Sequence, residues 1–349
     1  PWESSDVRTV IFNQGITHIG KDSFIIETLS GTVTIPEGVE SIGNTAFMGS
    51  NISEVQFPSS LKKIGGLAFN GTNISSVYIP ASVSEIGADA FSSSGLSKIM
   101  LDGGNTSFVL SSGCLYTKDM TRLLAVEGLS TRNIIVPDSV RSIDGLAFLN
   151  AAALETIELG KGVSDDFSEG LGVLYGCSRL TSITVSQDNE SFSSKDGVLF
   201  SKDGHELIAY PVNKPENVYY IPTGTTELRA HCFAWNQNLT ELILPDGMIT
   251  LGHTITAGCS NLKAVTIPKT VTDMEYAFNS HIGASLLIRG YVGSTAEAYA
   301  KEHNFQFIEL EEELPENACG KKLTWTLSED GVLTISGTGP MFDYDYTEL

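Results

Sequence analysis

One repeated segment dominates this chain of 349 residues, and it is clearest from Val77 to Lys98. The segment follows the pattern I-x-I-P-x-x-V-x-x-I-G-x-x-A-F and then carries a small residue three positions before an aliphatic one. Its proline recurs 22 residues apart at Pro36, Pro58 and Pro80, appears again at Pro137, and recurs 23 residues apart at Pro222, Pro245 and Pro268. A period of roughly 20–29 residues is typical of a solenoid in which each coil contributes one short strand.

The first half of each repeat reads as a strand that ends at the proline. In the clearest copy, Val77 and Ile79 share one face of the strand and Tyr78 takes the other, because side chains alternate along a strand. The proline lacks an N–H and therefore stops the strand. Ala90 and Phe91 are expected to fill the interior of the far side, on a short helical or 3₁₀ turn. These features predict about eight or nine coils, with parallel strands at the I-x-I positions.

The coils must stack, because a single repeat buries too few apolar side chains to offset the entropy of ordering its backbone. The repeat resembles the bacterial leucine-rich repeat class typified by the BspA surface antigens, through Ile42-Gly43 with Ala46-Phe47, Ile64-Gly65 with Ala68-Phe69, Ile86-Gly87 with Ala90-Phe91, Ile143 with Ala147-Phe148, and Met274 with Ala277-Phe278. The resemblance runs from about Val7 to Leu310. It implies an α/β, β-rich, right-handed leucine-rich-repeat solenoid with a parallel sheet on one face and short helical turns on the other. It also implies a secreted or surface-anchored bacterial protein used for adhesion or recognition.

Two stretches interrupt the repeat, near 102–133 and near 186–217, and they match each other. The matching residues lie 84 positions apart: Asn105, Phe108, Gly113, Tyr116, Lys118, Asp119 and Leu123 become Asn189, Phe192, Gly197, Phe200, Lys202, Asp203 and Leu207. Around Asp203-Gly204, polar and apolar residues alternate on both sides, which is a strong β-hairpin signal. We therefore expect each insert to be a hairpin that extends the sheet from one coil and has a structural role.

The repeats are expected to end in a helical cap near 287–308. Ser294 and Glu297 form a capping-box sequence, which predicts a short helix from Ala296 to His303 and a short strand after it. A charged helix in this position would shield the apolar side of the last coil, which would otherwise aggregate.

The sequence beyond the cap reads as the start of another unit. Residues 1–310 form the predicted solenoid, 311–318 an acidic linker, and 319–349 a partial β-hairpin that turns at Asp330-Gly331. This hairpin resembles the head piece that precedes repeat arrays in clostridial-type surface proteins, and Pro1-Trp2 resembles the continuation of such a head piece. We therefore expect a longer tandem protein, of which this chain starts within one module and ends within the next.

The composition narrows the possible partners. A net charge of −21 and a pI near 4.6 disfavour long-range attraction to nucleic acid or to an anionic membrane. No apolar run approaches the ~18 residues that a membrane-spanning helix needs. The five cysteines show no metal-binding spacing, and no disulfide framework is expected. Cys177, Cys232 and Cys259 occupy small core positions and are expected to be buried, whereas Cys114 and Cys319 lie outside the repeat and are candidates for exposed thiols.

No known catalytic motif is present, whether nucleophile elbow, zinc-binding helix, phosphate loop or dinucleotide fingerprint. The histidines are scattered without an i, i+4 pair, at His18, His205, His231, His253, His281 and His303. The carboxylate runs Asp165-Asp166 and Glu311-Glu312-Glu313 lack the alternating spacing of a calcium loop. We therefore expect no enzyme activity, no metal site and no cofactor.

The middle residue of each I-x-I strand points away from the core and forms an outward column along the solenoid. The column reads Ile11, Thr34, Gln56, Tyr78, Met100, Ile135, Glu158, Thr184, Tyr220, Ile243 and Thr266. A merely solvated face should be mostly polar, yet six of these eleven residues are apolar or aromatic. An exposed apolar strip usually marks a recognition surface. The candidate ligand-binding residues are therefore Tyr78, Met100, Ile135, Tyr220 and Ile243.

Two functions remain open from the sequence. The first is an extracellular or cell-surface recognition or adhesion module, monomeric, that binds a host or environmental protein or glycan on the sheet face. The alternative is a structural spacer or stalk within a longer tandem surface protein, with no ligand of its own. The apolar column also has a second explanation, because β-propensity favours such residues on any strand and the inserts are able to cover them.

Overall fold

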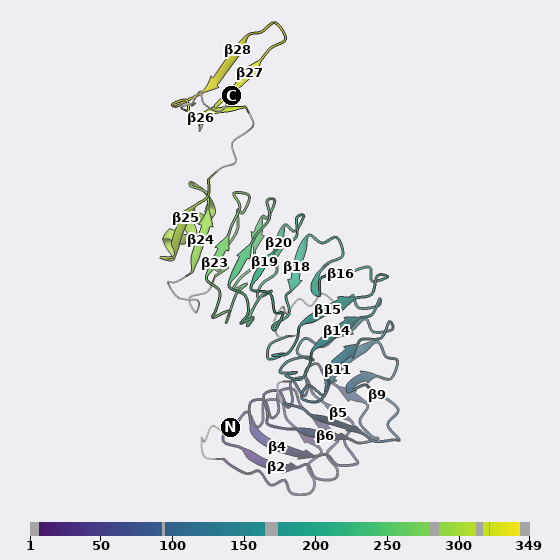
Figure 1. The fold of residues 1–349 in the computed structure, drawn as a ribbon. Coiled ribbons are helices and arrows are strands. Elements are labelled where there is room, and N and C mark those ends of the chain that lie inside the picture. Colours follow the sequence, from purple (N-terminus) through teal and green to yellow (C-terminus); the bar gives the residue numbers. More distant parts are fainter. Residues whose placement is uncertain are drawn as a thin grey trace.

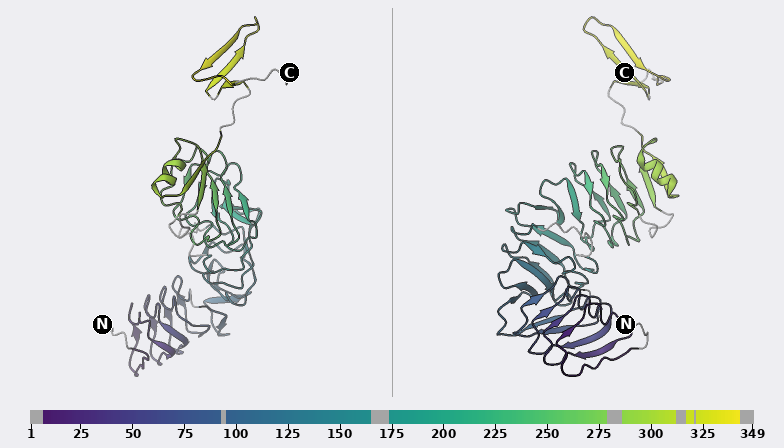
Figure 2. Two further views of the ribbon diagram at one scale, coloured as in Figure 1. Left: turned by 60° about the vertical axis from the view of Figure 1, so that its left-hand side comes forward. Right: turned by 180° about the vertical axis from the view of Figure 1, so that it is seen from behind.

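The computed structural model describes residues 7–92, 95–164, 174–278, 286–311, 317–320 and 322–342. The chain winds into a solenoid of about 12 turns, which confirms the predicted fold class. The stack follows a curved path, with the middle coils around β9 on one side and both ends of the stack on the other (Figures 1 and 2). The expectations for Pro1-Trp2, Asp165-Asp166, His281, Glu312-Glu313 and most of the predicted linker lie outside the described residues.

A first column of strands follows the I-x-I positions along the stack (Figure 1). Its members are β2 (Ser30–Thr34), β4 (Asn51–Gln56), β6 (Ser76–Ile79), β8 (Lys98–Leu101), β12 (Asn133–Ile135), β14 (Thr156–Leu159), β15 (Ser182–Val185), β19 (Val218–Tyr220), β21 (Glu241–Ile243), β23 (Ala264–Thr266), β24 (Leu287–Gly290) and β25 (Gln306–Glu309). The pairs that are hydrogen-bonded within this column are parallel. The prediction of eight or nine coils is wrong, because the coils that contain β8, β14, β15, β24 and β25 lack the proline that marks the others.

A second column of two-residue strands lies directly before the glycine position of the repeat, which is Gly43, Gly65 and Gly87 in the regular coils. It comprises β1 (His18–Ile19), β3 (Ser41–Ile42), β5 (Lys63–Ile64), β7 (Glu85–Ile86), β13 (Ser142–Ile143), β20 (Glu227–Leu228) and β22 (Thr250–Leu251). In this column β1, β3, β5 and β7 form one parallel sheet. This second column was not predicted from the sequence. A strand of two residues has no alternation long enough to reveal it.

The far side of each coil is built from turns rather than from the helical or 3₁₀ turns predicted for Ala-Phe. Alternate backbone amides there bond to the next coil, as Phe47 N does to Ala68 O and Phe69 N to Ala90 O, both at 2.8 Å. The amides between them bond within their own turn, as Asn70 N does to Leu67 O at 3.1 Å. The phenylalanine rings of successive coils stack on one another along the solenoid axis. The ring centroids of Phe47 and Phe69 lie 5.3 Å apart, and those of Phe69 and Phe91 lie 5.7 Å apart. This column of stacked rings forms the interior of the first coils.

Each insert is a three-stranded antiparallel meander, one strand more than the hairpin that the sequence predicted. The first contains β9 (Phe108–Ser111), β10 (Cys114–Thr117) and β11 (Arg122–Val126), and the second β16 (Phe192–Lys195), β17 (Val198–Ser201) and β18 (Glu206–Ala209). The third strand of each meander then pairs in parallel with the second column, β11 with β13 and β18 with β20. The inserts are therefore coils of the stack that carry an extra hairpin.

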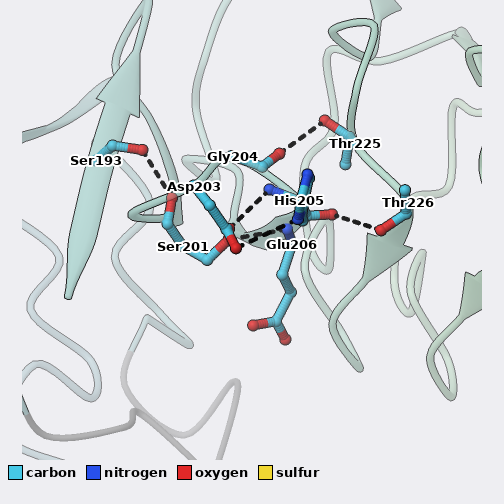
Figure 3. A network of polar contacts seen from close by, with 8 residues as sticks. All are labelled: Ser193, Ser201, Asp203, Gly204, His205, Glu206, Thr225 and Thr226. Carbon is cyan, nitrogen blue, oxygen red and sulfur yellow. Dashed lines mark hydrogen bonds and ion pairs between the residues drawn. The ribbon is translucent and has the colours of Figure 1, made fainter.

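A network of polar contacts holds the turn at Asp203-Gly204 in the second insert (Figure 3). The Asp203 carboxylate accepts hydrogen bonds from the Ser201 hydroxyl at 2.7 Å and from the His205 backbone amide at 3.1 Å. These bonds lower the pKa of Asp203, with the Ser201 bond as the main cause. The turn also bonds to the next coil, because Thr226 donates from its backbone amide to His205 O at 2.8 Å.

Each insert is tied to the following coil by an ion pair, and the two pairs have opposite polarity. In the first insert, Arg122 Nε lies 2.5 Å from the Asp144 carboxylate. In the second, Glu206 replaces the arginine and binds Arg229 through two bonds of 2.6 Å each. All four side chains are largely shielded from solvent. Burial raises the pKa of Asp144, and the hydrogen bond and charge of Arg122 oppose that rise.

The reversed polarity predicts that the second pair can be inverted. We expect Arg229→Glu to destabilise the fold by about 3 kcal/mol, since it leaves two carboxylates facing each other in a shielded site. Adding Glu206→Arg should restore most of that loss, because it creates the arrangement that Arg122 and Asp144 already show. Urea denaturation of the two single variants and the double variant measures this coupling, and additive losses would contradict it.

The end of the solenoid carries helix α1 (Thr295–Glu302), which begins one residue before the predicted position. Ser294 caps the helix, since its side chain accepts a hydrogen bond from Glu297 N. Beyond it, β26 (Ala318–Gly320), β27 (Leu323–Leu327) and β28 (Leu333–Gly337) form a separate antiparallel sheet. The domain limits drawn from the sequence stay predictions.

Candidate recognition surface

The five candidate residues lie at the outward positions of the first column, in three separate sheets. Tyr78 of β6 lies directly beside Met100 of β8. Tyr220 of β19 lies directly beside Ile243 of β21. Ile135 of β12 has Glu158 of β14 as its neighbour. The structure therefore brings the candidates together as two apolar pairs and one isolated isoleucine.

Four of the five side chains are open to solvent, which agrees with the assignment of inner and outer faces. Ile135 and Tyr220 are each 68% exposed, Tyr78 is 46% exposed and Met100 is 36% exposed, while Ile243 is partly buried. The flanking strand residues Val77 and Ile79, by contrast, are buried. The outward column is a real surface feature of the fold.

The inserts divide this surface, so the strip is not continuous. At the edge of β8, the amide of Ile99 donates to the Glu127 carboxylate at 2.8 Å instead of to a neighbouring strand. At the edge of β15, the amide of Ile183 donates to Gly197 O of the second hairpin, also at 2.8 Å. Met100 and Ile135 are consequently not on hydrogen-bonded strands. Apart from Ile11, which is exposed, the remaining column members are polar, as with Thr34, which donates to the Gln56 side chain at 3.1 Å.

Tyr78 is fixed by a polar neighbour. Its hydroxyl donates a hydrogen bond to the Asp102 carboxylate, and this bond raises the pKa of Tyr78 and lowers the pKa of Asp102. Asp102 also accepts from the backbone amide of Gly104 at 2.8 Å. The ring of Tyr78 is thus held in one orientation, with its hydroxyl engaged and its ring faces available for a flat contact.

The structure also exposes aromatic side chains that the sequence reasoning missed, on the far side of the coils. Tyr175 meets Trp235 edge to face, with ring centroids 5.0 Å apart, and both remain about two-fifths exposed. The indole lies flat against Gly258, where a side chain would collide with the ring. Tyr276 is exposed and lies 6.0 Å from the ring of His253. Trp235 and Tyr276 have positive φ, which places them at turn corners that the I-x-I pattern does not mark.

Comparison with known proteins identifies the repeat. The model of the BspA type leucine rich repeat region matches in six copies, over residues 2–118, 125–201 and 216–315. The chain belongs to this family. Proteins that carry BspA-type repeats are generally surface proteins involved in adhesion or protein interaction, and their repeats serve as non-enzymatic recognition scaffolds.

Several solved structures are similar to this BspA-type chain. The pneumococcal vaccine antigen PcpA is 19% identical, with 88% of this chain and 92% of that chain covered and a TM-score of 0.36. A leucine rich cell surface protein from Faecalibacterium prausnitzii A2-165 is 20% identical, with 87% of both chains covered and a TM-score of 0.48. A leucine-rich repeat protein from Eubacterium ventriosum ATCC 27560 is 19% identical, with 87% and 73% covered and a TM-score of 0.40. No curated protein matches the chain.

The titratable groups of this BspA-type chain offer little chemistry. All five cysteines are buried free thiols, so the expectation of exposure for Cys114 and Cys319 is wrong. Cys114 lies in β10 with its side chain in the core, and burial raises its pKa to about 11. Burial likewise raises the pKa of Cys177 and of Cys259 to about 12, so these thiols stay protonated and are poor nucleophiles.

Neither a metal centre nor a membrane span is found in the described part of the chain. Across those ranges, no three His, Cys, Asp or Glu side chains gather closely enough to hold a metal ion. Burial lowers the pKa of His231, which lies 2.6 Å through Nδ1 from the Thr254 hydroxyl. Among the residues with described positions, no helix is both long and apolar enough to cross a membrane.

Proposed function

We propose that the chain is a non-enzymatic recognition or adhesion module, secreted or displayed at the cell surface, that binds a host or environmental protein or glycan through the outward column. The observation that carries this proposal is the exposed apolar pairing of Tyr78 with Met100 and of Tyr220 with Ile243. Apolar groups that a fold leaves uncovered cost free energy in water, and a partner that buries them recovers it. Tyrosine adds a large, flat contact area at low entropic cost.

The inserts fit this function as dividers of the surface. Because they separate the two apolar pairs, each pair forms its own contact point along the curved stack (Figure 1). A partner that contacts both apolar pairs must be extended. A partner that contacts a single pair would bind weakly. Attraction should depend only modestly on salt, since the apolar members of the column carry no charge.

The test is a double variant with Tyr78→Ser and Tyr220→Ser. We expect at least a tenfold loss of affinity, or ~1.4 kcal/mol, for any ligand found on a glycan array or a panel of extracellular-matrix proteins. The matched control carries Thr34→Ser and Thr266→Ser, which lie in the same column and are already polar. That control should bind like the unmodified chain, and both variants must keep its melting temperature.

The spacer remains the competing function, because a stalk needs the same stacked coils and no ligand. If the folded tyrosine variant binds as tightly as the control, the outward column is not the binding surface. The spacer reading would then account better for the chain.

A further inference from the structure

Within the described residues, the second column of strands has an open edge in the middle of the stack, at β7. In that column each coil offers two backbone carbonyls to the next coil. In β5 these carbonyls are Lys62 O, which accepts from Ser84 N and Glu85 N, and Ile64 O, which accepts from Gly87 N at 2.9 Å. The equivalent carbonyls of β11, β18 and β20 are bonded in the same way by the coil that follows.

At β7 this pattern stops. The equivalent carbonyls are Ser84 O and Ile86 O, and within the described residues no backbone or side-chain donor reaches either of them. The Ile86 amide lies on the same edge, because Glu85 and Gly87 donate toward β5 and backbone groups alternate in direction along a strand. The edge therefore presents an acceptor, a donor and a second acceptor in a row.

The opening is bounded at both ends by side chains that bridge to later coils. At one end, Asn105 Nδ2 donates to Val83 O at 2.9 Å. At the other end, the Asp89 amide donates to the Asp144 carboxylate at 3.2 Å, and the Leu146 amide donates to the Asp89 carboxylate at 2.7 Å. Between these two bridges the next strand of the column is missing.

A groove of about 420 Å³ lies beside β7, where the missing strand would pair. One wall is β7 with Gly87, together with Gly65 and Gly66 of the preceding coil. The opposite wall comes from the first insert, through Ser107, Phe108, Thr117 and Arg122. The volume lies within the ~300–1,000 Å³ typical of ligand-binding clefts. The open stretch from Ser84 to Gly87 spans about 13 Å at ~3.3 Å per residue, which is enough for a strand of three or four residues.

We infer that this groove binds a short extended peptide segment of a partner protein, which pairs with Ser84 and Ile86 as the missing strand. The peptide donates two backbone N–H groups to Ser84 O and Ile86 O and accepts one bond from the Ile86 amide. An extended peptide is the ligand whose own donors and acceptors repeat at this spacing. An unpaired strand edge is also the standard place for such an addition.

The charges of the groove favour recognition of the peptide backbone rather than of a particular charge. Lys63 is already paired with Glu85 at 2.7 Å, and Arg122 with Asp144 at 2.5 Å. Both signs are thus balanced on the rim. We expect broad tolerance of side chains, with limited room beside the wall at Phe108.

The experiment selects a phage-displayed random heptapeptide library against the whole chain and then synthesises the selected heptapeptide. The test variant is Ser107→Trp, whose indole would fill the groove. The Ser107 side chain has no hydrogen bond within the described part of the structure, so its own loss should not disturb the fold. We expect Ser107→Trp to lower the affinity for the selected heptapeptide at least tenfold. The matched control is Ser191→Trp, at the equivalent position of the second insert, which should bind normally. Both variants must keep the melting temperature of the unmodified chain.

Two further readouts distinguish strand addition from another mode of binding. Bound heptapeptide should slow hydrogen exchange of the Ile86 amide at least tenfold. When the amides of the peptide are N-methylated one at a time, methylation at every second amide should abolish binding, and methylation of the amides between them should not. The Tyr78→Ser and Tyr220→Ser variant should retain the heptapeptide, because the two surfaces are separate. Failure to select any peptide sensitive to Ser107→Trp would overturn the inference. So would an unprotected Ile86 amide, or protection that appears without peptide and grows with protein concentration, which would indicate a second copy of the chain.

Discussion

Replacing Phe69 by alanine is expected to lower the free energy of unfolding by about 3–5 kcal/mol, which is the usual cost of removing a buried ring from a core. Phe69 is fully buried and stacks on Phe47 and Phe91 at centroid distances of 5.3 and 5.7 Å. It also contacts the tilted ring of Phe57 at 5.6 Å. The cavity left behind would lie between coils, where neither neighbour can collapse without breaking its own amide bonds to the next coil. Urea denaturation measures the change.

The matched control is Tyr78→Ala, which removes an aromatic ring from the outer face of the same region. Tyr78 is 46% exposed and makes one surface hydrogen bond, to Asp102. We expect a loss of less than about 1 kcal/mol, as for most surface substitutions. Equal losses for Phe69→Ala and Tyr78→Ala would show that the inner and outer faces have been assigned wrongly.

The parts of the fold that the sequence could predict are those in which a local pattern decides the direction of a side chain. Alternation in Val77, Tyr78 and Ile79 separates the core from the surface, and the structure buries the first and third and exposes the second. The 22-residue period gives the parallel stacking, because equivalent residues must then lie in register, as Tyr78 and Met100 do.

The features that the sequence could not reveal depend on contacts between coils that are distant in the chain. The sequence predicts a helical turn side because Ala-Phe suits a helix, but alternate amides there bond to the neighbouring coil, which interrupts a helical hydrogen-bond pattern. Cys114 was a candidate for exposure because it lies outside the repeat, yet β10 turns it into the core. The stacking of Trp235 on Gly258 likewise needs two coils and a positive φ at both residues.

The candidate surface also has a part that the sequence could predict and a part that it could not. Which residues face outward follows from alternation, and four of the five candidates are exposed. Whether those residues form one strip depends on the inserts. The sequence predicts their hairpins but not where these lie relative to the first column. The open edge of β7 arises from the same cause, since Asn105 and Asp144 bridge past the place where a strand would pair.

Replacing Asn189 by alanine should be as damaging as the loss of Phe69, although it removes only a small polar side chain. Asn189 is fully buried, and it makes four hydrogen bonds to the backbone. Its Nδ2 donates to Gly160 O and Val163 O at 2.9 Å, and its Oδ1 accepts from the amides of Ser191 and Phe192 at 2.8 Å. Alanine would leave all four backbone groups without that partner.

We expect Asn189→Ala to cost about 4 kcal/mol in the free energy of unfolding, since each buried backbone group left unsatisfied costs roughly 1–3 kcal/mol and some will find water. Asn105 makes the same four kinds of bond at the first insert, at 2.8–3.1 Å, so Asn105→Ala should cost a similar amount. The control is Asn217→Ala, at an exposed asparagine near the end of the second insert, which should change stability by less than about 0.5 kcal/mol. Urea denaturation of the three variants compares them directly. If Asn189→Ala were as mild as Asn217→Ala, the buried amide would not be what joins each insert to the coil before it.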